Sequence, residues 1–310
     1  MLDDGIQQLL QQIYASKRTP WNQIPLPSLR RALHKALASY DMPALPLADV
    51  QDSQTDTGIP VRIYRPRTDA CLPVLMYLHG GGWVTLGLDS HDSFCRLLAQ
   101  QGDCIVVAVD YRLAPEHRFP AGIEDAVASF LWLHTQMEQL NGDPQRIGIG
   151  GDSAGANIAL ALCQLLDSDP AMRPALQCLI YPVTDLVTRT PSRDQFSKGY
   201  GLDQPELDFY ERNYLNHLGE RNDLRVSPLL ADDVSHYPPT LLFTAGHDPL
   251  RDEGDAFATK LRAQGVSVTH ECFDSLIHGF LQMGRVPAAR SAMEKIAQQL
   301  HNGWKNLPAI

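Results

Sequence analysis

The pentapeptide Gly151-Asp152-Ser153-Ala154-Gly155 constrains the fold of this chain more than any other feature of the sequence. It follows a short apolar run at residues 146–150 and precedes a helical pattern at residues 154–166. A G-x-S-x-G sequence between a strand and a helix holds its serine in a sharp turn, where the hydroxyl stands clear of the backbone. The glycines are needed because side chains there would collide with the neighbouring strand and helix. We therefore predict that Ser153 is a nucleophile; the alternative is a glycine-rich turn whose serine only caps the helix.

Short β-rich runs alternate with amphipathic segments from residue 61 onward. The runs cover residues 61–64, 74–78, 105–109, 147–150, 176–181, 241–245 and 266–273. The helical segments between them cover residues 90–101, 122–139, 154–166 and 252–264. This alternation predicts an α/β fold, with a parallel sheet and helices on both faces. Ligands of such sheets bind at the carboxyl ends of the strands, and the Ser153 turn lies at one of those ends.

Two segments do not follow this alternation of β-rich runs and amphipathic helices. Apolar residues recur at helical spacing in the first 40 residues and predict two helices, which belong either to the core or to a lid. Residues 185–238 contain several prolines and glycines and then a helix-like run, residues 206–218, that is rich in aromatic side chains. We interpret this second segment as an insertion over the strand ends.

Composition excludes several classes of function. The formal net charge is −10 and no long basic run occurs, so nucleic-acid binding is not expected. The six cysteines form no C-x-x-C pair and indicate a reducing, cytoplasmic setting. The first residues lack the apolar stretch of a secretory signal, and no window approaches 18 continuous apolar residues. We therefore expect neither a leader nor a membrane span.

A serine nucleophile needs a base, and the base needs a carboxylate to orient it. Asp248 follows the run at residues 241–245, and His278 follows the run at residues 266–273. The chain order Ser153, Asp248, His278 places all three on strand-end loops, so we predict that they form a catalytic triad. The alternative histidines are His247 and His270. Asp248 could also be a helix cap, and Asp252 competes for a structural role nearby.

The segment His79-Gly80-Gly81-Gly82-Trp83 follows the run at residues 74–78. Attack on an ester carbonyl creates an oxyanion, and glycines allow backbone N–H groups to approach it closely. The N–H of Ala154, at a helix N-terminus, is a further donor. A phosphate cradle is the alternative, but the chain has no G-x-x-x-x-G-K-[ST] sequence and no complete dinucleotide fingerprint. Trp83 is expected to form a wall of the pocket or to pack in the core.

The chain resembles the bacterial hormone-sensitive-lipase family of carboxylesterases from about residue 60 to its end. The matching segments are His79-Gly80-Gly81-Gly82-Trp83, Asp110-Tyr111-Arg112-Leu113-Ala114-Pro115-Glu116, Gly151-Asp152-Ser153-Ala154-Gly155, Asp248-Pro249-Leu250-Arg251-Asp252-Glu253 and His278-Gly279-Phe280. The chain departs from the family at Ser275, where relatives often carry glycine.

The resemblance implies an α/β-hydrolase fold with a mostly parallel, twisted sheet of eight strands and a helical cap. Residues 1–45 and 185–225 would form the cap, and residues 46–184 and 226–310 the catalytic domain. Ser153 would be the nucleophile, His278 the general acid and base, and Asp248 its orienter. The oxyanion hole would consist of Gly81, Gly82 and Ala154. We also assign substrate contacts to three residues: Trp83, Asp152 and Phe209.

These features predict a serine carboxylesterase that hydrolyses short- to medium-chain acyl esters through an acyl-enzyme intermediate. A sugar-ester deacetylase or an arylformamidase-like amide hydrolase would use the same triad. A non-catalytic binding protein on this scaffold is a further alternative, although His278 is present. No cofactor or metal is expected, because His270 and His278 lack the i, i+4 spacing of a helical zinc site. The expected partner is a small-molecule ester, and the resemblance also allows a homodimer.

Overall fold

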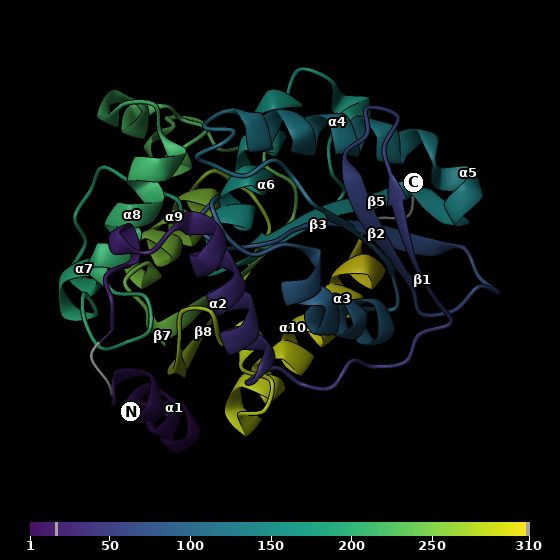
Figure 1. Cartoon of the computed structure of the whole chain (residues 1–310). Coiled ribbons are helices and arrows are strands. Elements are labelled where there is room, and N and C mark those ends of the chain that lie inside the picture. Colours follow the sequence, from purple (N-terminus) through teal and green to yellow (C-terminus); the bar gives the residue numbers. More distant parts are fainter. Residues whose placement is uncertain (16–17, 308–310) are drawn as a thin grey trace.

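The computed structural model describes residues 1–15 and 18–307 of the chain (Figure 1). In this part of the chain the strands form one sheet of eight in the order β1-β2-β4-β3-β5-β6-β7-β8. The strands are β1 (Asp49–Gln54), β2 (Pro60–Arg65), β3 (Leu72–Leu78), β4 (Ile105–Val109), β5 (Gly142–Asp152), β6 (Gln177–Ile180), β7 (Thr240–His247) and β8 (Val268–Ile277). β1 and β2 pair antiparallel with their neighbours, and the remaining pairs are parallel. The predicted fold class is confirmed.

Central strands and the edge strand differ in burial. β3, β4 and β6 are buried along their whole length, as expected for parallel strands covered by helices on both faces. β1 is polar and mostly exposed, and only one side of it pairs, with β2. The sequence analysis did not predict β1, because an exposed edge strand carries no apolar run.

Helices cover both faces of the sheet. On one face lie α4 (Ala121–Thr135), α6 (Ala154–Leu165) and α9 (Arg251–Ala263), and on the other α3 (Leu88–Gly102) and α10 (Pro287–Asn306) (Figure 1). Successive residues of β3 alternate between the two cores, with Met76 in one and Tyr77 in the other. A short helix, α5 (Met137–Leu140), follows α4. The sequence analysis did not predict α10, whose buried Ala292, Ile296 and Leu300 recur at helical spacing.

The remaining helices gather on the side of the molecule that carries the N-terminus (Figure 1). They are α1 (Asp4–Tyr14), α2 (Leu26–Ala38), α7 (Pro191–Gln195) and α8 (Gln204–Tyr214). Short 3₁₀ turns complete the chain at η1 (Trp21–Gln23), η2 (Pro170–Met172), η3 (Leu218–Asn222), η4 (Pro228–Leu230) and η5 (Phe280–Gln282). α1 begins at Asp3, whose carboxylate accepts hydrogen bonds from two backbone N–H groups of the first turn. α2, α7, α8 and α10 each begin with proline in the first turn.

The N-terminal segment packs against the segment that interrupts the α/β rhythm. The Tyr14 hydroxyl hydrogen-bonds Asp203 at 2.8 Å, and the Trp21 ring meets Tyr210 edge-on at 5.4 Å. Residues nearly 200 positions apart in sequence are therefore neighbours beside the strand ends. Across residues 1–15 and 18–307, no helix combines the length and the apolar character that crossing a membrane requires.

Candidate active site

Ser153 occupies the sharp turn between β5 and α6. Its backbone has φ 54° and ψ −118°, a conformation that a residue with a side chain seldom adopts. The turn is held by the Ser153 N–H, which donates to the carbonyl of Ile180 at 2.9 Å. Strain of this kind concentrates at functional sites, where the surrounding structure maintains it.

Close backbone approach explains the glycines on either side of Ser153. A Cβ atom on Gly155 would lie 2.0 Å from the carbonyl oxygen of Leu78, and one on Gly151 would lie 2.6 Å from the same oxygen. Any other residue at these positions would push α6 away from β3. The steric reason given for the pentapeptide is thus present in the structure.

The structure brings Ser153, His278 and Asp248 into one chain of hydrogen bonds. His278 Nε2 lies 2.9 Å from Ser153 Oγ, and His278 Nδ1 lies 2.8 Å from Asp248 Oδ2. Because a carboxylate only accepts, Nδ1 must donate, and a neutral ring then has Nε2 free to accept the serine proton. Asp248 is fully buried, and its second oxygen accepts the N–H of Leu250. The His278 ring packs against Tyr181, with centroids 4.5 Å apart.

The alternative partners of Ser153 lie elsewhere. The His247 ring stacks on Tyr200, and His270 Nε2 contacts Asp255 at 3.1 Å. Asp252 accepts the backbone N–H of Ser192 at 2.8 Å, so it has the structural role that was considered for it.

The glycine loop after β3 lines the same cavity as Ser153. Gly81 and Gly82 have φ values of 113° and 59°, and a Cβ on Gly82 would lie 2.1 Å from the Tyr210 ring. Among the described residues, none accepts a hydrogen bond from the N–H of Gly81, Gly82 or Ala154. Three unused donors near one hydroxyl are the arrangement that an oxyanion requires.

Asp152 anchors this loop rather than facing the solvent. Its buried carboxylate accepts hydrogen bonds from the Gly80 N–H and the Tyr77 hydroxyl, both at 2.9 Å, and lies 3.1 Å from His91 Nε2. Burial alone would raise the pKa of Asp152, but the attraction of His91 and the hydrogen bonds from His91, Tyr77 and Gly80 hold this pKa below its usual value. The charge therefore ties the glycine loop to the serine turn.

His79, the first residue of the loop, contacts both a neighbouring aromatic ring and the backbone of the loop. Its ring stacks on Tyr111 with centroids 4.4 Å apart, and its Nδ1 donates to the carbonyl of Gly80 at 2.7 Å. Burial, together with the neighbouring His91, lowers the pKa of His79 to about 4, so this ring is neutral at pH 7.

A cavity of about 600 Å³ opens above Ser153. Ser153, His278, Gly81, Gly82 and Trp83 all contribute to its lining. The opposite wall is apolar and comes largely from α1 and α2, through Leu9, Ile13, Leu29, Leu33 and Leu37. An apolar chamber with a few polar groups at one end is typical of sites for small, mostly apolar ligands.

The residues assigned to substrate contact have different positions. Trp83 lines the cavity and also stacks on Tyr214, with ring centroids 4.2 Å apart. Asp152 reaches the lining, but its carboxylate is occupied by the loop contacts described above. Phe209 lies outside this cavity, in a neighbouring depression beside Trp21, whereas Tyr210 lines the cavity. The two neighbours face different spaces because successive helix residues point about 100° apart.

Several residues at the site were not found from the sequence. Tyr77 and Tyr181 bind Asp152, and His91 belongs to the same network; all three are buried. Such residues resemble ordinary core positions until their neighbours are known. Within residues 1–15 and 18–307, no group of three or more His, Cys, Asp or Glu side chains is placed to hold a metal ion.

The chain is similar to known proteins both in sequence and in fold. Residues 75–282 match a family described by its α/β hydrolase fold. The chain is 41% identical to the carboxylic ester hydrolase LipN of Mycobacterium tuberculosis over 76% of its own length and 64% of that protein, slightly less than two thirds. It is 42% identical to an ethyl acetate hydrolase of Pseudomonas putida, over 74% and 73% of the two chains. The solved structure of the ester hydrolase EH1AB1, from the metagenome of Lake Arreo, superposes with a TM-score of 0.94 at 36% identity, covering 99% and 100%.

Proposed function

Because the chain belongs to the hormone-sensitive-lipase-like carboxylesterases of the α/β-hydrolase family, we propose that it hydrolyses carboxylic esters with Ser153 as nucleophile. His278 is the general base and acid of this proposal, and Asp248 is the residue that positions it. The observation that carries the proposal is the pair of hydrogen bonds from Ser153 Oγ to His278 and from His278 to Asp248, at 2.9 and 2.8 Å.

In the first half of the reaction, Ser153 Oγ attacks the carbonyl carbon and its proton passes to His278 Nε2. The imidazolium is stabilised by the buried Asp248 carboxylate. The bond to the alcohol oxygen then breaks, and the alcohol leaves with the proton from Nε2. Water attacks the acyl-enzyme, gives a proton to Nε2, and the acid is released as the proton returns to Ser153 Oγ.

We propose that the N–H groups of Gly81, Gly82 and Ala154 stabilise the oxyanion. Two observations support this role. None of the three N–H groups has an acceptor within the described structure, and the Ala154 N–H lies at the N-terminus of α6. Removal of one such donor in other enzymes costs on the order of a hundredfold or more in kcat.

Residues 1–45 and 185–225 form a cap in this proposal. The support is that α1, α2 and residues around α7 and α8 supply much of the cavity lining while the sheet supplies the triad. An apolar cavity of about 600 Å³ suits short- to medium-chain acyl esters, with no charged group needed on the alcohol. These two relatives are named for hydrolysis of carboxylic esters and of ethyl acetate, and not for sugar esters or amides, so deacetylation of sugars and hydrolysis of aryl formamides are not favoured.

A cytoplasmic location accords with the six cysteines, which are all free thiols. Fractionation of cells that express the protein tests this location, and recovery in a periplasmic or secreted fraction would contradict it.

Replacement of Ser153 by alanine tests the proposed function. The variant keeps the turn but removes the attacking oxygen, so kcat on p-nitrophenyl hexanoate should fall by three or more orders of magnitude. Covalent labelling by a fluorophosphonate should be lost in parallel. Hydrolysis at a near-native rate by the purified variant would exclude Ser153 as the nucleophile.

A further inference from the structure

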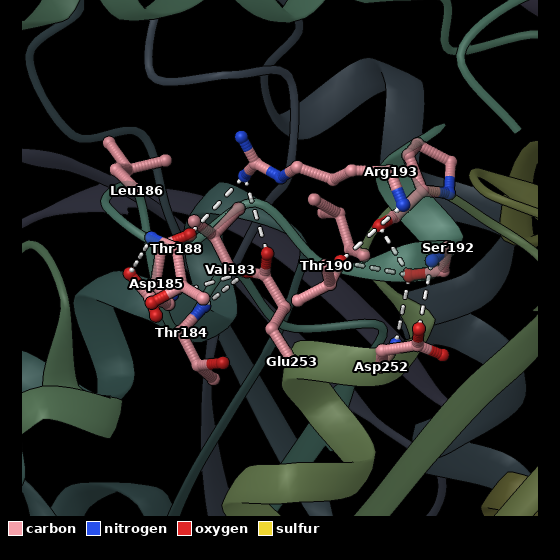
Figure 2. Close-up of polar contacts among 12 residues, drawn as sticks. Val183, Thr184, Asp185, Leu186, Thr188, Thr190, Ser192, Arg193, Asp252 and Glu253 are labelled. Atoms are coloured by element: carbon pink, nitrogen blue, oxygen red, sulfur yellow. Dashed lines mark hydrogen bonds and ion pairs between the residues drawn. The ribbon is translucent and has the colours of Figure 1, made fainter. Parts of the chain in front are cut away.

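A buried polar cluster adjoins the cavity on the side of α7 and α9 (Figure 2). The carboxylate of Glu253 is fully buried at the start of α9 and accepts the backbone N–H groups of Thr184 and Asp185, at 2.8 and 3.2 Å. Beside it, Ser192 and Asp252 join the two helices through reciprocal hydrogen bonds. The cluster therefore fixes the first turn of α7 against α9.

Arg193 of α7 is the cation of this cluster, and it uses few of its donors. Its Nη2 lies 3.3 Å from both the Glu253 carboxylate and the Asp185 carbonyl oxygen, which are long contacts for a charged pair. Its Nε is buried and meets no acceptor in the described part of the chain. Figure 2 shows the other terminal nitrogen of the guanidinium directed away from Glu253.

The same arginine lines the cavity that contains Ser153, although only 8% of its surface is exposed. A backbone hydrogen bond limits the distance between Arg193 and Ser153. The Val183 N–H donates to the carbonyl of Ser153 at 3.4 Å, and Asp185, which accepts from Arg193, follows two residues later. Two residues of chain span at most about 7 Å. The guanidinium therefore lies within roughly 15 Å of Ser153, and a substrate that extends along the shared cavity can reach both.

The other charged side chains of the lining already have partners. Arg18 contacts Glu206 at 3.1 Å, and Glu211 forms an ion pair with Arg221. A buried guanidinium with unused donors is costly, because its water has been removed without full replacement. A ligand that places a hydrogen-bond acceptor beside the Arg193 guanidinium would offset this free-energy cost of desolvation.

We propose that Arg193 binds a carboxylate carried by the substrate at a distance from the scissile ester. The substrates of this class are half esters of dicarboxylic acids, with the charge on the acyl part, or acyl esters of hydroxy acids, with the charge on the alcohol part. A planar guanidinium suits a carboxylate because it can offer two parallel donors. This inference rests on the proposed esterase activity.

When Glu253 is ionised, its negative charge offsets the positive charge of Arg193. Burial raises the pKa of Glu253 to about 7, with the attraction of Arg193 opposing the rise, so part of the protein at neutral pH carries a neutral Glu253. In that fraction Glu253 no longer offsets the positive charge of Arg193. Glu253 and Arg193 should therefore affect an anionic substrate in opposite directions.

The test compares two matched pairs of esters, by release of ethanol for the ethyl esters and by release of acetate for the acetate esters. Ethyl hydrogen adipate and ethyl hexanoate have acyl chains of the same length and differ in a terminal carboxylate against a methyl group. 4-Acetoxybutanoate and butyl acetate make the same comparison on the alcohol part. The quantity measured is the ratio of kcat/KM for the charged ester to that for its neutral match, which cancels general damage to the enzyme.

Two variants should move this ratio in opposite directions for one of the two ester pairs. Arg193→Met removes the guanidinium and keeps an apolar stem, and it should lower the ratio by roughly tenfold or more. Glu253→Gln keeps an acceptor for Thr184 and Asp185 but removes the competing charge, and it should raise the ratio several-fold. The double variant Arg193→Met/Glu253→Gln removes both members of the pair and should match the single arginine variant.

Arg18→Met is the matched control, because it removes another arginine of the same cavity that is paired and more exposed. A similar fall of the ratio in this control would mean that the cavity attracts anions without using Arg193, and would overturn the inference. So would movement of the ratio in the same direction by Arg193→Met and Glu253→Gln, or no change in either. Failure of the wild-type protein to hydrolyse ethyl hexanoate and butyl acetate would instead overturn the proposed function, and the inference with it.

Discussion

At the scale of single residues, the site depends on backbone conformation and on buried hydrogen bonds as well as on the triad. Ser153 has a strained backbone, and the neighbouring Asp152 holds the glycine loop by accepting the Gly80 N–H. The buried charge of Asp152 is matched by donors from three other elements, β3, α3 and the loop after β6. Because these partners surround one carboxylate, a change there should alter the geometry of the loop as well as stability.

Asp152→Asn should lower kcat between tenfold and a hundredfold, with a smaller change in KM. The amide introduces donors where Tyr77 and His91 already donate, so the loop and its N–H groups should shift by more than oxyanion stabilisation tolerates. Asp125→Asn is the control, since Asp125 is equally buried but binds Arg112. Steady-state kinetics and urea unfolding of both variants check the prediction; equal loss of kcat in both would contradict it.

At the scale of elements, α2 is held over the cavity mainly by one side chain. Only Leu29 of α2 is buried, whereas Arg30 donates to the carbonyl oxygens of Val84 and Ala114 and forms a double hydrogen bond with Glu116. These contacts join α2 both to the turn after the glycine segment and to the loop after β4. The position of this cavity wall thus depends on a polar contact at the surface.

Arg30→Ala should raise KM for p-nitrophenyl hexanoate several-fold and leave kcat nearly unchanged, because α2 detaches while the triad stays intact. Amide hydrogen exchange in residues 26–38 should accelerate as the helix opens locally. The neighbouring Arg31→Ala serves as control, since Arg31 contacts only Ser28 of its own helix turn within the described structure. Indistinguishable KM values for the two variants would show that α2 does not depend on Arg30.

Glu253, which lies at the contact between α7 and α9, makes the free energy of unfolding depend on pH. The folded-state pKa of Glu253 is about 7, above the value near 4.3 of an unfolded glutamate. The native state therefore holds the extra proton, and its stabilising contribution, complete below about pH 4.3, is lost as the pH rises through 7.

Glu253→Gln removes this titration. The free energy of unfolding of the variant relative to wild type should therefore rise by about 2 kcal/mol between pH 5 and pH 8. Urea unfolding at several pH values measures the difference, and Glu124→Gln, which changes an exposed glutamate, is the control. A constant difference across this range would mean that Glu253 is ionised throughout.

At the scale of the whole molecule, the cavity sets the size of the ester. It has a volume of about 600 Å³, and an apolar wall from α1 and α2 faces the serine. Each additional buried CH₂ stabilises a bound chain by about 0.8 kcal/mol, but a chain that leaves the cavity gains nothing further. We therefore expect elements on the N-terminal side to determine the substrate range, and the loops at the strand ends to carry out the chemistry.

Among p-nitrophenyl acetate, hexanoate and palmitate, kcat/KM should be highest for one of the two shorter esters. Palmitate should be at least tenfold slower, because its 16-carbon chain exceeds the cavity. An initial-rate panel below the micellar concentration of each ester measures this. Fastest hydrolysis of palmitate would show that the N-terminal helices open into a larger binding surface.

The sequence by itself determined the elements whose residues must satisfy local steric rules. Gly151 and Gly155 are dictated by the approach of α6 to β3, so the serine turn and the strands around it could be predicted. The order of Ser153, Asp248 and His278 on strand-end loops allowed their meeting to be anticipated, since parallel strands end at one edge. The exposed strand β1 was missed because it has no apolar pattern to reveal it.

Only the tertiary structure decided which residues share a space. Whether Phe209 or Tyr210 faces the cavity depends on the rotation of α8, and periodicity does not specify that angle to within one residue. The pairing of Arg193 with Glu253 joins residues 60 positions apart, and the network of Asp152 joins strands and a helix. Local patterns in a chain report which face of an element is buried, but the identity of the neighbour across that face is set by how the elements pack.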